Sequence, residues 1–397
     1  MSFQFSLDDL QFLMSDAGQQ LLTECHHLPA EDMALTSWLS KKRRLHSPQQ
    51  TAAVLETSQL RRIAVRKWGE HASQLFFTRD ALEQASDPLV RAYRANLITT
   101  ARVVDACCGI GTDAITFAQM GKQVQALDTD ALRLAMARHN ARVMGCEIEF
   151  IEADVTWCAF DNEVVFFDPA RRDARGARLQ HVEHYIPPLS TLRRWQHATH
   201  IYVKVSPGVE LQELSSYRGT LFFISVEGEL KEALLSFDPT QPTLNRVAVR
   251  LSVHHPPMQF VSTETFATFP LTPPMSWIHE PDPAILRAGY VQHLAQLLGA
   301  SMLDPTIAYL TTEHIAQSEW IRSWRVVEWM PFNLKHLKQQ LRARSVGHVT
   351  IKKRGHPLTP EALQAKLSLK GDESLTLFLT KVKGIPAVIL CEDQQVG

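Results

Sequence analysis

The feature that most constrains the fold is an apolar run, Val103–Val104, that ends in the acid Asp105 and leads into a glycine-containing turn. The turn carries Gly109 and Gly111, and a helix-like segment begins at Thr112. Glycine suits this turn because the backbone has to bend sharply and lie close to a ligand. A buried strand, a tight turn and a helix start together present backbone N–H groups to a polar ligand.

A second apolar run, residues 124–127, ends in Asp128, at a spacing that suits a bidentate grip on ribose hydroxyls. Gly109, Gly111 and Ala114 match the G-x-G-x-x-G/A fingerprint of dinucleotide-binding folds, with Asp128 as the ribose acid. A nicotinamide cofactor is therefore one interpretation of this stretch.

The same stretch, acid-x-Cys-x-Gly-x-Gly, also resembles motif I of the class I S-adenosylmethionine methyltransferases. Asp105 is the acid, and Cys107 stands at the usual first glycine. The resemblance implies that Asp105 lies near the amino acid moiety of the cofactor, a role that a dinucleotide site does not have. The cofactor-binding residues predicted on this interpretation are Thr78, Asp105, Cys107, Gly109, Gly111, Asp113, Asp128 and Asp154.

From residue 97 onward, strands and helices alternate, which predicts a parallel sheet with right-handed crossovers. Four successive predicted strands end at an acid, so these acids meet at the carboxyl edge of the sheet, where ligands bind. They are Asp105, Asp128, Asp154 and Asp168. Further strands after residue 220 follow with only short loops, which favours a closing antiparallel hairpin. That ending is typical of methyltransferases rather than dehydrogenases, so S-adenosyl-L-methionine is the predicted cofactor.

The fourth predicted strand runs into Asp168-Pro169-Ala170-Arg171, at the position of motif IV, where the methyl acceptor sits. Proline makes this turn rigid and leaves Asp168 facing the acceptor. An amine acceptor needs a group that aligns its N–H and takes up the developing charge, and a carboxylate can do both. The predicted catalytic residues are Asp168, Pro169 and Lys204. Lys204, near the end of the fifth strand, could steer the base or contact phosphate, or it could only cap the strand.

Two known acceptor patterns differ from this one. Amino-methyltransferases usually carry Asn/Asp-Pro-Pro-aromatic, and this chain lacks the second proline and the aromatic residue. Asp-Pro-Ala-Arg instead resembles uridine C5-methyltransferases of RNA, which require a cysteine nucleophile just after strand five, where this chain has Ser206-Pro207. A carbon acceptor activated by a thiolate is therefore disfavoured. In the loop after Asp168, Arg171 and Arg172 suit phosphate recognition, or alternatively pair with nearby acids.

Three further segments complete a family resemblance: residues 76–86 (FFTRDALEQAS), 204–208 (KVSPG) and 351–355 (IKKRG). With the motifs above, they make the chain similar, from about residue 50 to its end, to bacterial class I methyltransferases with a C-terminal THUMP-like domain. THUMP domains bind RNA in tRNA-modifying enzymes, so the resemblance implies an RNA substrate, tRNA or rRNA. Thr78 lies in a segment that resembles the one covering the methionine end of the cofactor in several RNA-modifying methyltransferases, although it could equally cap a helix.

Positive charge is concentrated near the C-terminal end of the sequence. From Arg322 onward there are 13 Lys/Arg against 6 Asp/Glu residues, although the formal net charge of the whole chain is −1. This asymmetry favours a polyanionic partner, while ordinary solvated lysines remain the alternative. Lys352, Lys353 and Arg354 follow a predicted strand and form the candidate RNA surface. Such phosphate contacts give affinity but little sequence choice.

A chain of 397 residues is longer than a single hydrophobic core usually accommodates, so several domains are expected. The predicted fold class is α/β, with a Rossmann-like class I methyltransferase sheet, an N-terminal helical region and a small C-terminal α+β domain. The predicted domains are a helical region at 1–96, the methyltransferase domain at 97–255, a Pro-rich linker or arm at 256–325 and a THUMP-like RNA-binding domain at 326–397.

Composition excludes other classes of protein. No apolar run approaches the roughly 20 residues of a membrane span, and the first residues lack the features of a signal peptide. The six cysteines show no C-x-x-C spacing, which disfavours a disulfide framework or a zinc site. The expectation is a cytoplasmic protein that binds no metal and no membrane.

The sequence therefore predicts an S-adenosylmethionine-dependent methyltransferase that acts on a base nitrogen in RNA. A small-molecule or protein methyltransferase, whose basic tail only aids solubility, is the first alternative. The second alternative is a non-catalytic RNA-binding protein with a cofactor-binding core. Asp168 argues against this last alternative, because a site that has lost its catalytic activity need not keep the acid on its acceptor side.

Overall fold

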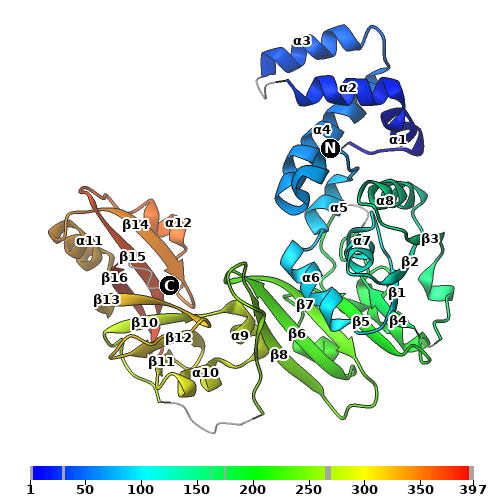
Figure 1. The fold of residues 1–397 in the computed structure, drawn as a ribbon. Helices are drawn as coiled ribbons and strands as arrows, with labels where there is room; N and C mark the ends of the chain where they lie inside the picture. The colour runs from blue at the N-terminus through cyan, green and yellow to red at the C-terminus, as the bar shows by residue number, and fades with distance from the viewer. Residues whose placement is uncertain (1–2, 29–31, 162, 174–175, 264–269, 393–397) are drawn as a thin grey trace. The chain divides into compact units, whose positions relative to one another are not determined.

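The computed structural model describes residues 3–28, 32–161, 163–173, 176–263 and 270–392 (Figure 1). The chain divides into two compact units. The first unit contains residues 1–222 and 231–245, and the second contains residues 223–230 and 246–397. Within the described residues, no helix has the length and apolar character needed to cross a bilayer.

The first unit begins with the predicted helical region. Its helices are α1 (Leu7–Met14), α2 (Asp16–His26), α3 (Asp32–Lys42) and α4 (Pro48–Trp68), followed by a 3₁₀ turn, η1 (Gly69–Ser73). Ser6 and Ser47 start α1 and α4 with capping boxes: the serine hydroxyl accepts from the backbone N–H of the third helical residue, whose side chain accepts from the backbone N–H of the serine. Leucines of α1 and α2 share one core with Val54 and Leu60 of α4, so α4 is fixed along its length.

A mostly parallel sheet follows, and all of it except residues 223–230 in its last two strands belongs to the same unit. Its strands are β1 (Arg102–Ala106), β2 (Gln123–Asp128), β3 (Glu149–Glu152), β4 (Val164–Phe167), β5 (His200–Val205), β6 (Gly219–Val226) and β7 (Glu229–Phe237). They lie in the order β3-β2-β1-β4-β5-β7-β6. The first five are parallel, and β7 pairs antiparallel with β5, so the predicted antiparallel ending is confirmed. The strand order reverses between β1 and β4, which is where such sheets bind ligands.

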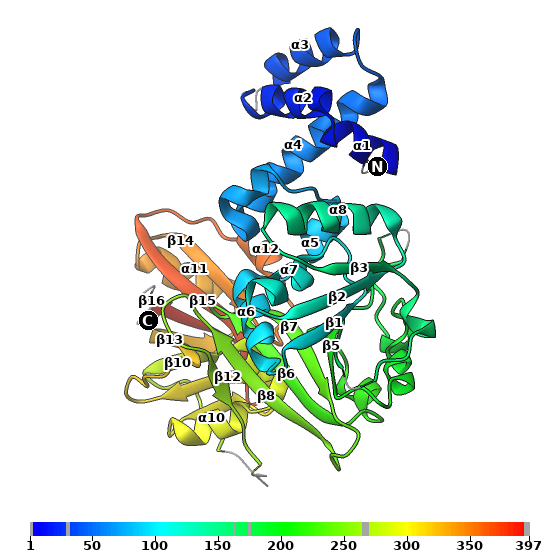
Figure 2. The same ribbon diagram turned by 45° about the vertical axis from the view of Figure 1, so that its right-hand side comes forward.

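Helices accompany the sheet within this unit. They are α5 (Arg79–Gln84), α6 (Pro88–Leu97), α7 (Thr112–Gln119) and α8 (Ala131–Val143). Figures 1 and 2 show α7 and α8 lying along β1, β2 and β3, which they contact. Beyond β3, the helical segments in the described parts of the connections are 3₁₀ turns: η2 (Val155–Trp157), η3 (Val182–His184), η4 (Leu189–Arg194) and η5 (Leu211–Leu214). Pro187 and Pro188 lie in the β4–β5 connection, where proline opposes a continuous helix.

The second unit contains a β8–β9 pair and a seven-stranded sheet of order β11-β12-β10-β13-β16-β15-β14. The strands are β8 (Leu244–Leu251), β9 (Met258–Phe260), β10 (Trp277–Pro281), β11 (Ser301–Asp304), β12 (Ile307–Thr312), β13 (Ile321–Pro331), β14 (Val346–Lys353), β15 (Glu373–Val382) and β16 (Ile385–Glu392). The helices are α9 (Pro283–Ala288), α10 (Val291–Leu297), α11 (Leu334–Ala343) and α12 (Pro360–Gln364). The α/β fold class is confirmed.

The stretch interpreted from sequence as a Pro-rich arm holds regular structure. It contains β10, α9, α10, β11 and β12, with Pro283 at the first position of α9, which tolerates proline. Strand β13 pairs with β10 on one side and with β16 on the other. The stretch and the C-terminal residues therefore share one sheet, so a truncation within β13 would cut through that sheet.

Candidate active site

The turn after β1 adopts a backbone conformation that leaves room for a ligand. Cys107, Gly109 and Gly111 have φ angles of 68°, 54° and 80°. A residue with a side chain pays about 1–2 kcal/mol for this left-handed region, and Cys107 adopts it where related motifs place glycine. A Cβ at Gly111 would lie 3.1 Å from the Cβ of Ala137 on α8, whereas one at Gly109 would meet nothing within 4 Å. The turn therefore packs tightly against α8 at Gly111 and is open at Gly109.

Asp128, the last residue of β2, holds the turn in place. Its Oδ2 accepts a hydrogen bond from the Gly109 N–H at 2.8 Å, and its Oδ1 accepts one from the Asp130 N–H at 2.9 Å. Asp154, two residues beyond β3, accepts hydrogen bonds from the Thr156 N–H and hydroxyl, and these bonds lower the pKa of Asp154. Both acids stand at the predicted carboxyl edge of the sheet.

Asp105 is the most deeply buried acid of the edge. It is 1% exposed, and neither carboxylate oxygen has a hydrogen-bond partner among the described residues. Burial raises the pKa of Asp105 well above its usual range, and the charges of Asp113 and Asp168 raise it further. The fold therefore favours the neutral acid at this position.

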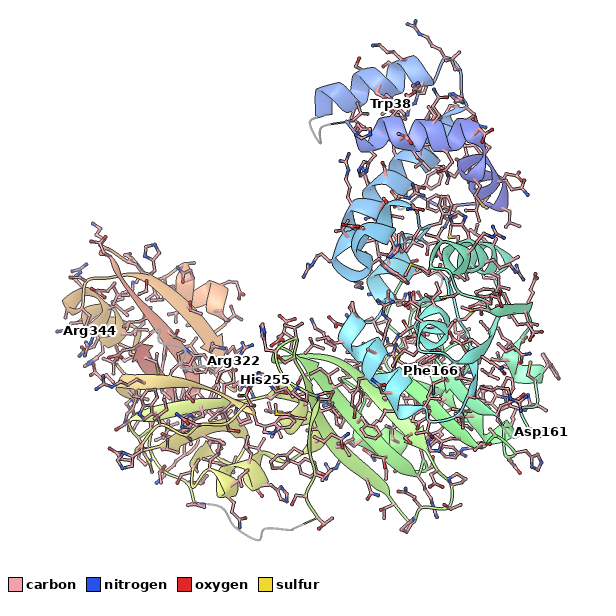
Figure 3. All side chains as sticks on the ribbon, in the orientation of Figure 1. Trp38, Asp161, Phe166, His255, Arg322 and Arg344 are labelled. Carbon is pink, nitrogen blue, oxygen red and sulfur yellow. The ribbon has the colours of Figure 1, made fainter. Side chains whose placement is uncertain are left out.

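Asp113 is engaged by a residue that the sequence did not single out. Arg94 of α6 binds the Asp113 carboxylate and also both oxygens of Glu232 on β7. The Arg94 guanidinium lies 4.9 Å from the ring centre of Phe166 in β4. Figure 3 labels Phe166. Burial alone would raise the pKa of Asp113, but the charges of Arg94, Lys204 and Arg91 together outweigh it and the pKa is lowered. The ion pairs attach α6, α7 and β7 to one another at the start of α7.

Asp168 and Lys204 come together because β4 and β5 are parallel neighbours. Lys204 Nζ lies 2.6 Å from Asp168 Oδ2, and the side chains are 4% and 26% exposed. The Asp168 N–H donates to the Ala106 carbonyl oxygen at 3.1 Å, which ties this turn to β1. Two predicted catalytic residues thus form an ion pair beside the β1 turn, and the buried Pro169 follows them.

Asn140, which sequence analysis missed, attaches the segment before the sheet to this turn. Its Oδ1 accepts from the Phe76 N–H at 2.9 Å, and its Nδ2 donates to the carbonyls of Phe76 at 3.0 Å and Ile110 at 3.3 Å. Thr78 follows directly, and its hydroxyl caps α5 by accepting from the Ala81 N–H at 3.2 Å. Asn140 is fully buried, and a buried amide needs partners, but no local pattern in the sequence marks it.

The predicted RNA-contacting residues have partners of their own. Arg171 donates to the Val205 carbonyl at 3.3 Å and Arg172 to the Gly176 carbonyl at 2.8 Å. In the second unit, Lys352 lies 2.6 Å and Arg354 3.2 Å from carboxylate oxygens of Glu280. Because Glu280 neutralises Lys352 and Arg354, fewer cations at the end of β14 are free to bind a polyanion.

Comparison with known proteins identifies the family. Over 337 residues the chain is 33% identical to S-adenosylmethionine-dependent methyltransferases of two Mycobacterium tuberculosis strains, CDC 1551 and H37Rv, covering 83% of this chain and 92% of each relative. The chain belongs to this family of S-adenosylmethionine-dependent methyltransferases. A solved structure of a methyltransferase described as putative, from Porphyromonas gingivalis W83, shares the fold, with a TM-score of 0.73, 24% identity and coverage of 91% of this chain and 98% of that one.

Family models match three parts of this methyltransferase. Residues 100–185 match the RNA cap guanine-N2 methyltransferase model, and residues 321–393 match the THUMP domain-like model. Residues 6–64 match a domain of unknown function, DUF8688. The enzyme is thus a class I methyltransferase with a C-terminal THUMP-like domain, and its cofactor is S-adenosyl-L-methionine.

The geometry of the edge fits this cofactor. The turn is open at Gly109, Asp128 is held beside it, and Asp105 is a buried acid without a partner. S-adenosylmethionine carries an amino group, a sulfonium and two ribose hydroxyls, which are the groups that such acids and backbone amides can bind.

The Asp105→Asn substitution is expected to make the cofactor-free enzyme more stable at neutral pH. The raised pKa means that folded Asp105 binds its proton more tightly than the unfolded chain does, so ionisation favours unfolding above the usual pKa of aspartate. Asparagine does not ionise, so its advantage should be present at neutral pH and vanish as the pH falls below about 4. Thermal unfolding of both proteins across this range measures it. A wild-type enzyme that is equally or more stable at pH 7 contradicts the buried neutral acid.

Proposed function

We propose that this methyltransferase transfers the methyl group of S-adenosylmethionine to a nitrogen of an RNA base. The observation that carries the proposal is the Asp168–Lys204 ion pair beside the β1 turn. Lys204 occupies Oδ2 of Asp168, and no described residue binds Oδ1. Oδ1 is therefore available to accept the N–H hydrogen bond of an acceptor amine and to receive its proton as positive charge develops. Pro169 keeps the turn rigid, and Lys204 holds the carboxylate in place.

In this proposal the cofactor lies along the carboxyl edge. Asp128 binds the ribose hydroxyls, Asp154 binds near the adenine, and Asp105 lies near the amino acid moiety. Backbone groups of residues 107–111 line the site. Asp113 and Thr78 do not contact the cofactor in this proposal. Asp113 anchors the start of α7 through Arg94, and Thr78 caps α5. S-adenosylmethionine supplies the electrophilic methyl group, and the protein's contribution is largely position.

A thiolate mechanism for a carbon acceptor has little support in this site. Ser206 follows β5 where uridine C5-methyltransferases need cysteine. Cys107 and Cys108 belong to the β1 turn, and burial together with the neighbouring acids raises the pKa of both thiols well above the usual range. A thiol held neutral is a poor nucleophile. This favours a nitrogen acceptor over a carbon acceptor.

An RNA substrate is supported by the THUMP-like and RNA cap guanine-N2 methyltransferase models and by the charge of the C-terminal residues. Because Glu280 engages Lys352 and Arg354, we place the RNA surface of this domain at Lys353 and at the exposed lysines of α11, Lys335 and Lys338. Since bacterial RNA is modified in the cytoplasm, we also place the enzyme there.

Transfer of a labelled methyl group tests the proposed substrate. The full-length enzyme is incubated with methyl-labelled S-adenosylmethionine and with separate RNA, protein and small-molecule fractions of a bacterial extract. We expect label in the RNA fraction, and we expect nuclease but not protease to release it. Label confined to the protein or small-molecule fraction would overturn the RNA proposal and favour the alternative substrate class.

A further inference from the structure

The first unit contains a pocket of about 730 Å³. Its walls come from α4, from residues 79–90, from the loop after β4, from the loop after β5 and from the start of β7. Lys204 lines this pocket and binds Asp168. The pocket therefore adjoins the group to which we assign the methyl acceptor.

The lining of the pocket is strongly basic. Eight lysine and arginine side chains line it against three carboxylates, and two of the three carboxylates are occupied: Asp87 caps α6 and Glu232 binds Arg94. Five of the cations have no carboxylate within 4.0 Å among the described residues. They are Arg66, Lys67, Arg171, Arg172 and Arg178. Such an excess of uncompensated charge around a concave site favours a polyanion.

Helix α4 contributes one wall, which carries both apolar and cationic side chains. Leu60, Ile63 and Lys67 follow one another at helical spacing and therefore share a face with Arg66. Ile63 is 53% exposed, which is unusual for an isoleucine that is not covered by another part of the fold. An apolar surface next to cations suits a nucleotide, whose base or sugar is apolar on its faces and whose phosphate is charged.

We propose that this pocket binds the phosphodiester backbone of the RNA next to the target nucleotide, with α4 as one wall and the loop after β4 as the other. The inference rests on the proposed RNA substrate. It goes beyond that proposal because it gives the N-terminal helices a role in substrate binding, through Arg66 and Ile63. Arg178, which lines the same pocket from the loop after β4, completes the clamp. The C-terminal domain then supplies a second, separate contact.

The test compares tRNA binding by the full-length enzyme and by the Arg66→Ala/Arg178→Ala variant. Both arginines are exposed and neither has a described side-chain partner, so the variant should fold as the wild type does. Fluorescence anisotropy with purified bacterial tRNA is measured over a salt series. We expect affinity to fall by about tenfold for each arginine, and the slope of log K against log salt to decrease by about 2 in magnitude. Unchanged affinity for S-adenosylhomocysteine shows that the cofactor site is intact.

The matched control is Arg43→Ala/Arg44→Ala, which removes the same charge from exposed positions of the N-terminal region outside the pocket. Equal losses in the two variants, an unchanged salt slope in the pocket variant, or no binding of tRNA by the wild type would each overturn the inference. Labelled RNA with unchanged binding by the pocket variant would leave the proposed function standing and remove this inference. Weaker tRNA binding by the pocket variant, with no label in RNA, would support the pocket inference and overturn the proposed function.

Discussion

Replacing Asp168 by alanine is expected to lower kcat for methyl transfer by about 100-fold or more and to leave the affinity for S-adenosylhomocysteine unchanged. Asp168 stands where β4 ends, with one carboxylate oxygen on Lys204 and the other without a described partner. In the proposed reaction this second oxygen aligns the acceptor N–H and takes up its proton. Without it, the acceptor loses both its orientation and its proton acceptor.

Two further variants separate chemistry from folding. Asp168→Asn keeps the volume of the side chain and an oxygen that can face Lys204, but it cannot take up a proton, so it should be almost as inactive as the alanine variant. Asp161→Ala removes an exposed acid, labelled in Figure 3, from the β3–β4 connection; Asp161 does not line the pocket that Lys204 lines, so this variant should be fully active. Single-turnover methyl transfer and calorimetric titration with S-adenosylhomocysteine measure both properties. An Asp168→Ala enzyme with wild-type kcat would exclude the assigned role.

Arg94→Met is expected to destabilise the first unit by about 3–5 kcal/mol. Arg94 is 1% exposed and is the only described cation paired with Asp113 and Glu232, which are themselves buried. Methionine fills similar space but leaves two buried carboxylates without the cation that pairs with them directly. The start of α7 and the β1 turn that precedes it should loosen, so cofactor affinity should fall with stability.

The surface pair Arg344–Glu328 is the matched comparison (Figure 3). Its side chains are 33% and 30% exposed, and such pairs are worth about 0–1 kcal/mol. Arg344→Met should therefore change the urea midpoint of unfolding little, whereas Arg94→Met should lower it clearly. Similar small shifts in both variants would show that the buried network does not hold the turn.

Much of the site could be predicted from sequence because its parts are local. The strand-ending acids, the left-handed turn and the antiparallel ending each follow from a short pattern of residues. Cys107 is instructive: the pattern placed it where related motifs have glycine, and its φ of 68° shows that the backbone keeps the glycine conformation. Thr359 likewise caps α12 and Pro360 is its first residue, an order that is typical of helix starts.

The remaining features depend on partners far away in the chain. Arg94 meets Glu232 across 138 residues, and Asn140 meets Phe76 across 64. The predicted RNA surface on β14 is altered by Glu280, which lies 72 residues before Lys352. No local pattern reveals such pairs, because a charged or amide side chain looks the same in sequence whether it faces water or a buried partner.

The position of the transferred methyl group tests the account most directly. RNA methylated by the enzyme is digested to nucleosides, and mass spectrometry with isotopically labelled S-adenosylmethionine locates the label. The account predicts a single N-methylated nucleoside that is absent from the Asp168→Ala reaction. A C5-methylated uridine, or an N-methylated product that forms equally well without Asp168, would contradict it.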